Sequence, residues 1–305
     1  MKIRDCFTTI YYNSIWGRTI IHPILQLRNF LIPLERRLKM RFFRRLGYRL
    51  NLIEPKSLNE KIQWLKVHDR SELHVQCADK YKVRNYVKEK VGSEYLIPLV
   101  YNTKNPQNID PRKLPNYPFI IKNNHDSGGV TIVWDKKSLD WEELTKKLKR
   151  QLNYVYDYGK GEWQYKQIEP RIVIEKLLLD KRGKVPSDFK FHVMNGTVAF
   201  IQVDIERETN HKRNLYNPEW DLLPCLWMYE NGESIKKPEN LHEMITLAEK
   251  LAEGFIFVRV DFYNVENKIY FGEMTFHPAS GFKKFLPEDW DFKFGELLEL
   301  PGKSD

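Results

Sequence analysis

Charged residues interrupt an otherwise apolar, hairpin-like stretch near the end of the chain, VRVDFYNVENKIYFGEMTFHPASGF. If a three-residue turn at 266–268 joins two antiparallel strands, Asp261 lies opposite Glu273. Arg259 then lies opposite Thr275, and paired side chains on one face of a sheet have Cβ atoms about 4.5–5.5 Å apart. The sequence therefore predicts a compact cluster of two carboxylates, a guanidinium and a hydroxyl.

The alternation of side chains along a strand separates this cluster from the apolar residues of the same hairpin. The apolar side chains that point the other way are Val258, Val260, Phe262, Met274 and Phe276. Two carboxylates this close repel each other unless a proton or a cation lies between them, and two oxygen ligands with phosphate and water suit Mg²⁺. We therefore predict a metal site at Asp261 and Glu273. A solvent-facing sheet surface with an ion pair is the alternative.

A second segment, YPFIIKNNHDSGGVTIVW, has a pattern typical of phosphate binding. A strand ends at Lys122, a polar loop with Ser127, Gly128 and Gly129 follows, and a new strand begins at Val130. A loop of this kind lets the backbone close on phosphate oxygens beside a lysine charge. It lacks the G-K-[ST] sequence of a Walker loop, and an ordinary Gly-Gly hairpin turn is the alternative.

Helical patterns dominate the first 95 residues, and short strand patterns dominate the rest. SLNEKIQWLKVHD begins with Ser57 and has Glu60 three residues later, which is the capping-box pattern of a helix N-terminus. Further helices are predicted at 73–87, 139–159 and 240–254. The predicted strands are 96–101, 119–122, 130–134, 171–179, 189–205 and the C-terminal hairpin. This order predicts an α+β fold with mostly hairpin-connected strands.

The positive charge is confined to one end of the chain. The net charge is +9, and residues 1–50 alone hold eleven basic and two acidic residues. A nucleic-acid-binding protein would spread its basic residues over the folded body, so this distribution argues against a nucleic-acid partner. Apolar and aromatic residues alternate with arginine in this arm, which leaves two alternatives open. Residues 15–50 lie on an anionic membrane surface, or they pack on the protein with a solvated basic face.

The composition of the whole chain is that of an ordinary globular protein. The 305 residues are 42% hydrophobic, which is enough for one large or two small cores. No secretion signal or membrane-spanning stretch is recognisable, so we expect a cytoplasmic protein whose membrane contact, if the arm makes one, is peripheral. The three cysteines lack C-x-x-C spacing, which predicts neither a disulfide framework nor a zinc site.

The order of these segments resembles the ATP-grasp fold, as seen in D-alanine–D-alanine ligases. The metal-binding end of that fold has R-x-D, a turn, a glutamate and a glycine-containing tail, which match Arg259, Asp261, Glu273 and Gly281. More narrowly, NEKIQWLKVHDR, CADKYKVRNYVKEKVGSEYLIPLV, PFIIKNNHDSGG and YFGEMTFHPASGF are similar to the TupA-like branch, named for teichuronopeptide biosynthesis. The resemblance extends from about residue 45 to about residue 300.

The resemblance implies ATP and Mg²⁺ as cofactors and a role for each matching residue. The ATP-binding positions are Lys80, Lys122, Ser127, Gly128, Gly129, Glu175, Lys176, Leu177 and Asp188. Among them, Glu175 and the backbone of the next two residues match the adenine contact, and Asp188 matches the ribose-binding acid. Lys190 and Arg259 match catalytic positions beside the phosphates and the acyl phosphate. Asp261, Glu273 and Thr275 match the metal ligands, although ligases commonly have Asn at the position of Thr275, which puts a second metal in doubt.

The resemblance also implies an organisation and a reaction. The basic arm, 1–50, and a helical region, 51–115, precede a small ATP-grasp lobe, 116–176, and a large lobe with the metal site, 177–305. The implied activity is a carboxylate–amine ligase that uses ATP and acts through an acyl phosphate.

The expected partners of such a ligase are ATP, an amino acid or amine, and a carboxylate-bearing sugar or lipid-linked glycan of the bacterial cell surface. The candidate substrate residues are His211, Arg213, His277 and Ser280. A glycosyltransferase of surface polysaccharide synthesis and a nonenzymatic membrane-associated scaffold remain as alternatives.

Overall fold

The computed structural model describes residues 27, 31–126, 129–153, 160–207 and 210–302. The helices in these ranges are α3 (Leu34–Leu46), α4 (Leu58–His68), α5 (Glu72–Ala78), α6 (Val83–Lys90), α7 (Trp141–Leu152), α8 (Leu241–Leu251) and α9 (Asp289–Glu296). The strands are β1 (Leu99–Thr103), β2 (Phe119–Asn123), β3 (Val130–Val133), β4 (Ile172–Lys176), β5 (Asp188–Met194), β6 (Thr197–Ile205), β7 (Lys212–Tyr216), β8 (Leu226–Trp227), β9 (Phe257–Val265), β10 (Lys268–Thr275) and β11 (Phe285–Leu286). The predicted α+β class is confirmed.

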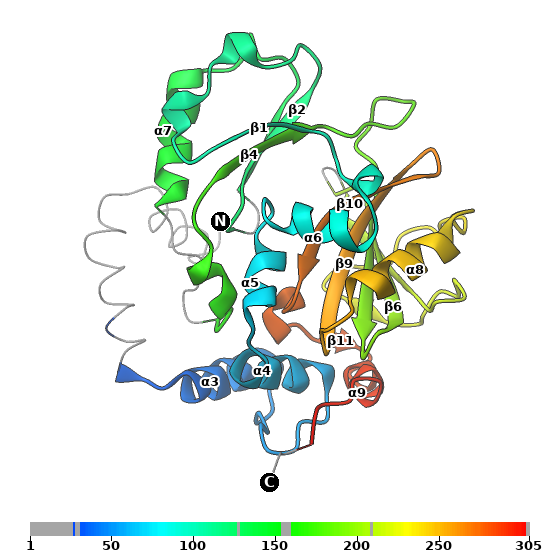
Figure 1. Ribbon diagram of the computed structural model, residues 1–305. Helices are drawn as coiled ribbons and strands as arrows, with labels where there is room; N and C mark the ends of the chain where they lie inside the picture. The colour runs from blue at the N-terminus through cyan, green and yellow to red at the C-terminus, as the bar shows by residue number, and fades with distance from the viewer. Residues whose placement is uncertain (1–26, 28–30, 127–128, 154–159, 208–209, 303–305) are drawn as a thin grey trace.

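A small antiparallel sheet with the strand order β1-β4-β2-β3 forms the upper part of the molecule in Figure 1. One face of it packs against α7, whose Leu144 and Leu148 share a core with Phe119, Ile121 and residues of β4. Strand β1 belongs to this sheet although it lies in the region 51–115, so the small sheet begins earlier in the chain than the predicted small lobe.

A large antiparallel sheet with the strand order β10-β9-β5-β6-β7 carries the main core on one face (Figure 1). Helices α5, α6 and α8 cover that face, where odd-numbered residues of β5 and β6, such as Phe191 and Ile201, are buried. Because side chains alternate along each strand, the even-numbered residues 188–192 of β5 and 200–204 of β6, on one side of a β-bulge, point to the opposite face. That opposite face is rich in buried charge.

The hairpin β9–β10 has the predicted register at its functional end, because Glu273 pairs with Asp261 and Thr275 pairs with Arg259. The predicted three-residue turn is wrong. A two-residue turn joins Val265 to Lys268, with positive φ values of 53° and 63° at its two central residues. A β-bulge between Phe271 and Glu273 then shifts the pairing by one residue and restores the predicted register.

Helix α4 begins as predicted. The side chain of Ser57 accepts a hydrogen bond from the backbone of Glu60, and the Glu60 carboxylate accepts one from Ser57, which completes the capping box. Helix α4 lies at the base of the molecule between α3 and α9 (Figure 1).

Helix α3 begins directly after Pro33, and its Leu38, Phe42 and Leu46 are buried against the body of the protein. Within the described residues, the apolar face of the arm therefore packs on the protein, which is the second of the two alternatives given above. No helix in the described ranges is both long and apolar enough to cross a membrane.

Other elements differ from the sequence prediction. The predicted helix 73–87 is two short helices, because Asp79 ends α5 and accepts hydrogen bonds from the backbone of Tyr81 and Lys82. The predicted helix 139–159 ends at Leu152, and residues 154–159 lie outside the described ranges. Strand β7 and helix α9 were not predicted, because neither has a clear hydrophobic period.

Candidate functional site

The charged face of the large sheet is centred on Arg259. Its guanidinium donates to both carboxylate oxygens of Asp261 at 2.6 and 2.7 Å and to Glu273 at 2.8 Å. Thr275 donates to the same oxygen of Glu273 at 3.1 Å. The predicted cluster is therefore assembled, with the guanidinium bridging the two carboxylates.

The two carboxylates differ in their surroundings. The Asp261 side chain is 6% exposed, and that of Glu273 is 39% exposed. Burial acts to raise the pKa of both groups, and for Glu273 the charges of Arg259 and Lys80 outweigh it and lower the pKa to about 2. Glu273 is therefore the ionised carboxylate that the site presents to solvent.

Lys190 lies one strand away from Asp261. Its ammonium is 3.0 Å from Asp261, 3.4 Å from Asp188 and 3.7 Å from Asp204. Asp188, the predicted ribose ligand, is buried and also contacts Arg207. The structure thus joins Lys190 and Asp188 to the cluster around Arg259 in one buried ionic network.

The predicted substrate residues His211 and Arg213 lie at the other edge of this network. Arg213 is on strand β7, where it is buried and forms an ion pair of 2.6 Å with Asp204. His211 lies 3.2 Å from Asp204, and its ring contacts Tyr229. The two residues therefore lie beside the Asp204 carboxylate.

The two lysines predicted to bind ATP both contact groups of the small sheet or of the loop after β2. The Lys80 ammonium contacts the carbonyl of Asp126, in the loop after β2, and burial lowers its pKa although Glu273 and Asp126 oppose the shift. Lys122 forms an ion pair of 2.6 Å with Glu175, which is also 2.9 Å from Arg84. The α5–α6 junction and the small sheet thus meet at these charges.

The predicted adenine contact lies where β4 ends. The backbone N–H groups of Lys176 and Leu177 donate to the carbonyls of Pro98 and Pro118, each at 3.1 Å. Glu175 is buried by its two cationic partners. An adenine contact at this hinge stays a prediction, and it would use carbonyl oxygens more readily than these N–H groups.

The predicted phosphate loop is described only in part. Ser127 and Gly128 lie outside the described residues. At Gly129, an added Cβ would meet the Asp126 carboxylate at 2.1 Å, so a side chain there would force Asp126 to move. The loop backbone therefore runs close to a carboxylate that lines the site cavity described next.

A cavity of about 300 Å³ adjoins the exposed carboxylate of Glu273. Thr275, His277 and Ser280 line it, so the structure brings together the hairpin and these two predicted substrate residues. Burial, with the nearby charge of Lys66, lowers the pKa of His277 well below its usual range, so this histidine is neutral. The cavity is suited to a small polar molecule beside the carboxylate cluster.

Comparison with known proteins places this arrangement in a family. The TupA-like ATP-grasp family matches residues 60–299. The chain belongs to this family. The predicted ATP-grasp fold is thereby confirmed.

This TupA-like ATP-grasp protein is also similar to individual ligases. It is 29% identical over 220 residues to a D-alanine–D-alanine ligase of Helicobacter pylori (strain HPAG1), covering 69% of this chain and 54% of the relative. The chain thus spans about half the length of the curated relative it matches.

Solved structures with a similar fold include two amino acid ligases. The D-alanine–D-alanine ligase from Helicobacter pylori has 19% identity, a TM-score of 0.42, and coverage of 80% of this chain and 69% of that one. The L-amino acid ligase from Bacillus licheniformis has 13% identity, a TM-score of 0.44, and coverage of 83% and 56%.

The donor set of the ATP-grasp protein fits a magnesium ion that is held together with phosphates. Among the described residues, no group of three or more His, Cys, Asp or Glu side chains is placed to hold a metal by itself. Mg²⁺ usually takes one or two protein carboxylates and fills its other positions with phosphate and water. Glu273 and Asp261 supply such a pair, and Asp261 must share its oxygens with Arg259 and Lys190.

Sequence reasoning missed the residues that support the cavity. Gln63 of α4 donates to the carbonyls of Ser280 and Gly281 at 3.1 and 2.7 Å, and the fully buried Lys66 donates to Ser280 at 2.8 Å. The cavity also has Arg41 of α3 in its lining. The missed signal was polar residues on the apolar side of a capped helix.

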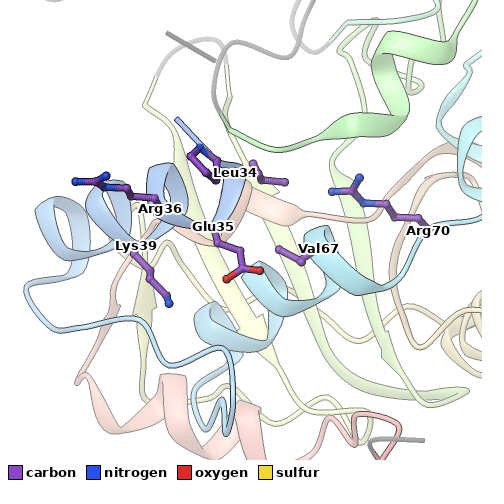
Figure 2. A pocket seen from close by; sticks show the side chains of 7 residues that line it. Leu34, Glu35, Arg36, Lys39, Val67 and Arg70 are labelled. Atoms are coloured by element: carbon purple, nitrogen blue, oxygen red, sulfur yellow. The ribbon is translucent and has the colours of Figure 1, made fainter. Parts of the chain in front are cut away.

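A separate, larger hollow of about 700 Å³ lies between α3 and the end of α4, and it shares none of its lining residues with the site cavity. Figure 2 shows Glu35 in its middle, with Arg36 and Lys39 on one side and Arg70 on the other. Charged and apolar side chains both line this hollow, and none of the predicted site residues is among them.

Proposed function

We propose that this protein is an ATP-dependent carboxylate–amine ligase that acts through an acyl phosphate. The observation that carries the proposal is the buried Arg259–Asp261–Glu273 cluster, which ends in an exposed carboxylate at the cavity. Lys80, Lys122 and Lys190 are cations close to this cluster or to the end of the small sheet, and they suit the phosphates of ATP. The family membership and the similarity to curated D-alanine–D-alanine ligase support the reaction class.

The proposed reaction has two balanced steps. A carboxylate oxygen of the substrate attacks the γ-phosphorus of ATP, the bond to the bridging oxygen breaks, and ADP leaves. The nitrogen of an amine then attacks the acyl carbon, phosphate leaves, and the nitrogen loses a proton to give an amide. Magnesium at Glu273 and Asp261 would neutralise charge on the phosphates, while Arg259 and Lys190 hold those carboxylates in place and stabilise the transferred group.

We infer that the carboxylate substrate is an acidic sugar of a cell-surface polysaccharide or of its lipid-linked precursor, and that the amine is an amino acid. Membership of the TupA-like family and the basic lining of the cavity support this choice. A glycosyltransferase is less well supported. The sequence contains one D-x-D, at 289–291, but Asp291 is buried and accepts hydrogen bonds from Asn59, and Asp289 pairs with Lys293. That pattern therefore joins α9 to α4.

We also propose peripheral membrane contact, and the observation that supports it is the exposed side of α3. Met40 and Phe43 are exposed there, near the exposed basic residue Lys39. Apolar and basic side chains on one exposed helix face suit an anionic lipid surface. Cosedimentation with phosphatidylglycerol vesicles, compared with phosphatidylcholine vesicles, tests it, and equal partition to both would contradict it.

The ligase proposal is tested by two measurements on the full chain. A ligand at 100 times its Kd adds about 2.7 kcal/mol of stability, so Mg-ATP should raise the Tm by about 5 °C or more. Mg²⁺ alone and UDP-glucose are the controls. Hydroxylamine then replaces the unknown amine, because it converts an acyl phosphate of glucuronic acid into a hydroxamate. Stabilisation by UDP-glucose without stabilisation by Mg-ATP would reject the ligase.

A further inference from the structure

The site cavity has a basic side formed by parts of the chain that are distant in sequence. Its acidic lining residues are Asp126, Glu162 and Glu273, and its basic ones are Arg41, Arg45, Lys160, Arg259 and Lys283. The carboxylates include Glu273, which the proposed reaction assigns to magnesium. The basic residues exceed the acidic ones, so the cavity as a whole favours an anion.

Helix α3 fixes two of these basic residues in place. Leu38, Phe42 and Leu46 recur every four residues and are buried, which anchors the helix along its length. Arg41 and Arg45 have the same spacing, so they lie one turn apart on a neighbouring face. Both arginines line the cavity, and the buried apolar face of α3 fixes the helix that carries them.

The lining of the cavity also includes a constrained turn. Ala279, Ser280 and Gly281 have consecutive positive φ values of 49°, 56° and 57°. Backbone in this region costs free energy for residues other than glycine, and it persists where the surroundings enforce it, often at functional sites. Here Gln63 and Lys66 enforce it through the hydrogen bonds to the turn carbonyls.

The turn also presents a hydrogen-bonding group to the cavity. The Ser280 hydroxyl is buried and has no hydrogen-bond partner among the described residues, although Ser280 lines the cavity. Leaving a buried hydroxyl without a partner is unfavourable, and a ligand oxygen in the cavity would supply that partner. Arg41 is tied to the same turn, since its guanidinium carbon lies 5.4 Å from the centre of the Phe282 ring.

We propose that the cavity binds a substrate with two anionic groups, and that Arg41, Arg45 and Ser280 bind the group that does not react. The reacting carboxylate lies beside Glu273, and the second group is a phosphate borne by the same sugar unit. Arginine suits this task because its planar N–H groups bind a phosphate through two parallel hydrogen bonds. The inference rests on the proposed ligase function, and it names the substrate class as a phosphorylated uronic acid.

The proposal predicts a preference for the phosphorylated sugar. Rates of hydroxamate formation with glucuronic acid 1-phosphate and with glucuronic acid measure it. We expect the wild-type KM to be at least tenfold lower for the phosphorylated sugar. Arg41→Gln and Arg45→Gln should each raise that KM about tenfold or more, with the kcat and the KM for ATP unchanged. Arg44→Gln is the matched control, because it removes the same charge from the same helix at an exposed residue outside the cavity lining.

Calorimetric titration of glucuronic acid 1-phosphate into the protein, without ATP, provides a readout that does not depend on turnover. Binding that Arg45→Gln weakens and Arg44→Gln retains would support the proposal even if no hydroxamate forms. Equal binding by wild type and both variants would overturn it, as would absence of binding at millimolar concentration. Failure of the ligase proposal would give a different result, because Mg-ATP would then not raise the Tm of the wild-type protein.

Discussion

Replacing Asp261 with Asn would separate its role in the site from its role in the fold. The carboxylate accepts two hydrogen bonds from Arg259 and one from Lys190 at 3.0 Å. Asn has nearly the same volume but only one acceptor oxygen, and its NH₂ group would face a cation. Breaking a buried ion pair costs about 3–5 kcal/mol when the remaining charge has no other partner.

The remaining partners reduce that cost. Arg259 keeps Glu273 at 2.8 Å, and Lys190 keeps Asp188 at 3.4 Å. We therefore expect Asp261→Asn to lose about 2 kcal/mol of stability, a cost below the full one for a broken buried pair. That loss corresponds to a fall in Tm of roughly 3–4 °C in a chain of this size. The chain should still fold, while hydroxamate formation and the stabilisation by Mg-ATP are lost.

Differential scanning calorimetry with and without Mg-ATP, together with the hydroxamate assay, checks both effects. Asp291→Asn is the matched control, because Asp291 is a buried carboxylate that accepts hydrogen bonds from Asn59 between α4 and α9. It should lower the Tm and keep the Mg-ATP stabilisation. A rate of hydroxamate formation in Asp261→Asn within twofold of wild type would refute the metal role, and an unchanged Tm would refute the buried network.

The structure makes three further predictions. Phe42→Ala should lower the free energy of unfolding by about 3–5 kcal/mol in urea titration, because Phe42 is fully buried, whereas Phe43→Ala, at a side chain 54% exposed, should change it by less than about 1 kcal/mol. Burial raises the pKa of the Cys77 thiol to about 12, so mass spectrometry should find it unlabelled by iodoacetamide at pH 8 in the native state and labelled in urea. Burial opposes ionisation of Asp204, but Arg213 holds its pKa well below the usual value, so its ionised form stabilises the fold above about pH 4. The stability lost in Asp204→Asn should thus be constant from pH 7 to 5 and shrink below about pH 4, and a difference that grows on acidification would contradict this sign.

The register at the functional end of the hairpin was predictable because strand alternation leaves few choices. Arg259, Asp261 and Glu273 had to share a face if Val258 and Val260 were to be buried. The turn was not predictable from alternation, since the bulge beside Gly272 compensates for the shorter loop. An added Cβ at Gly272 would lie 3.1 Å from the Asp261 carbonyl, so glycine permits the close approach of the two strands.

Whether the basic arm packs on the protein or on a lipid surface could not be predicted from its own residues. An apolar stripe with arginines beside it serves equally for a lipid surface and for a protein core. What places the apolar stripe of α3 in a protein core is the presence of partners such as Phe282, which is more than two hundred residues away in the chain and lies in one cluster with Leu38 and Phe42. Single-sequence patterns carry no information about such distant contacts.

Lys66 shows why the N-terminal helices belong to the site as well as to the scaffold. A fully buried ammonium is costly unless hydrogen bonds satisfy it, and Lys66 donates to Gln63 at 3.0 Å and to the Ser280 carbonyl at 2.8 Å. Its ammonium also lies 4.5 Å from the centre of the Phe282 ring. These contacts fix both ends of the turn that carries Ser280, and that turn continues directly from strand β10 and Glu273. We therefore expect a movement of α4 to shift this cavity wall relative to Glu273 and, with it, any substrate bound in the cavity.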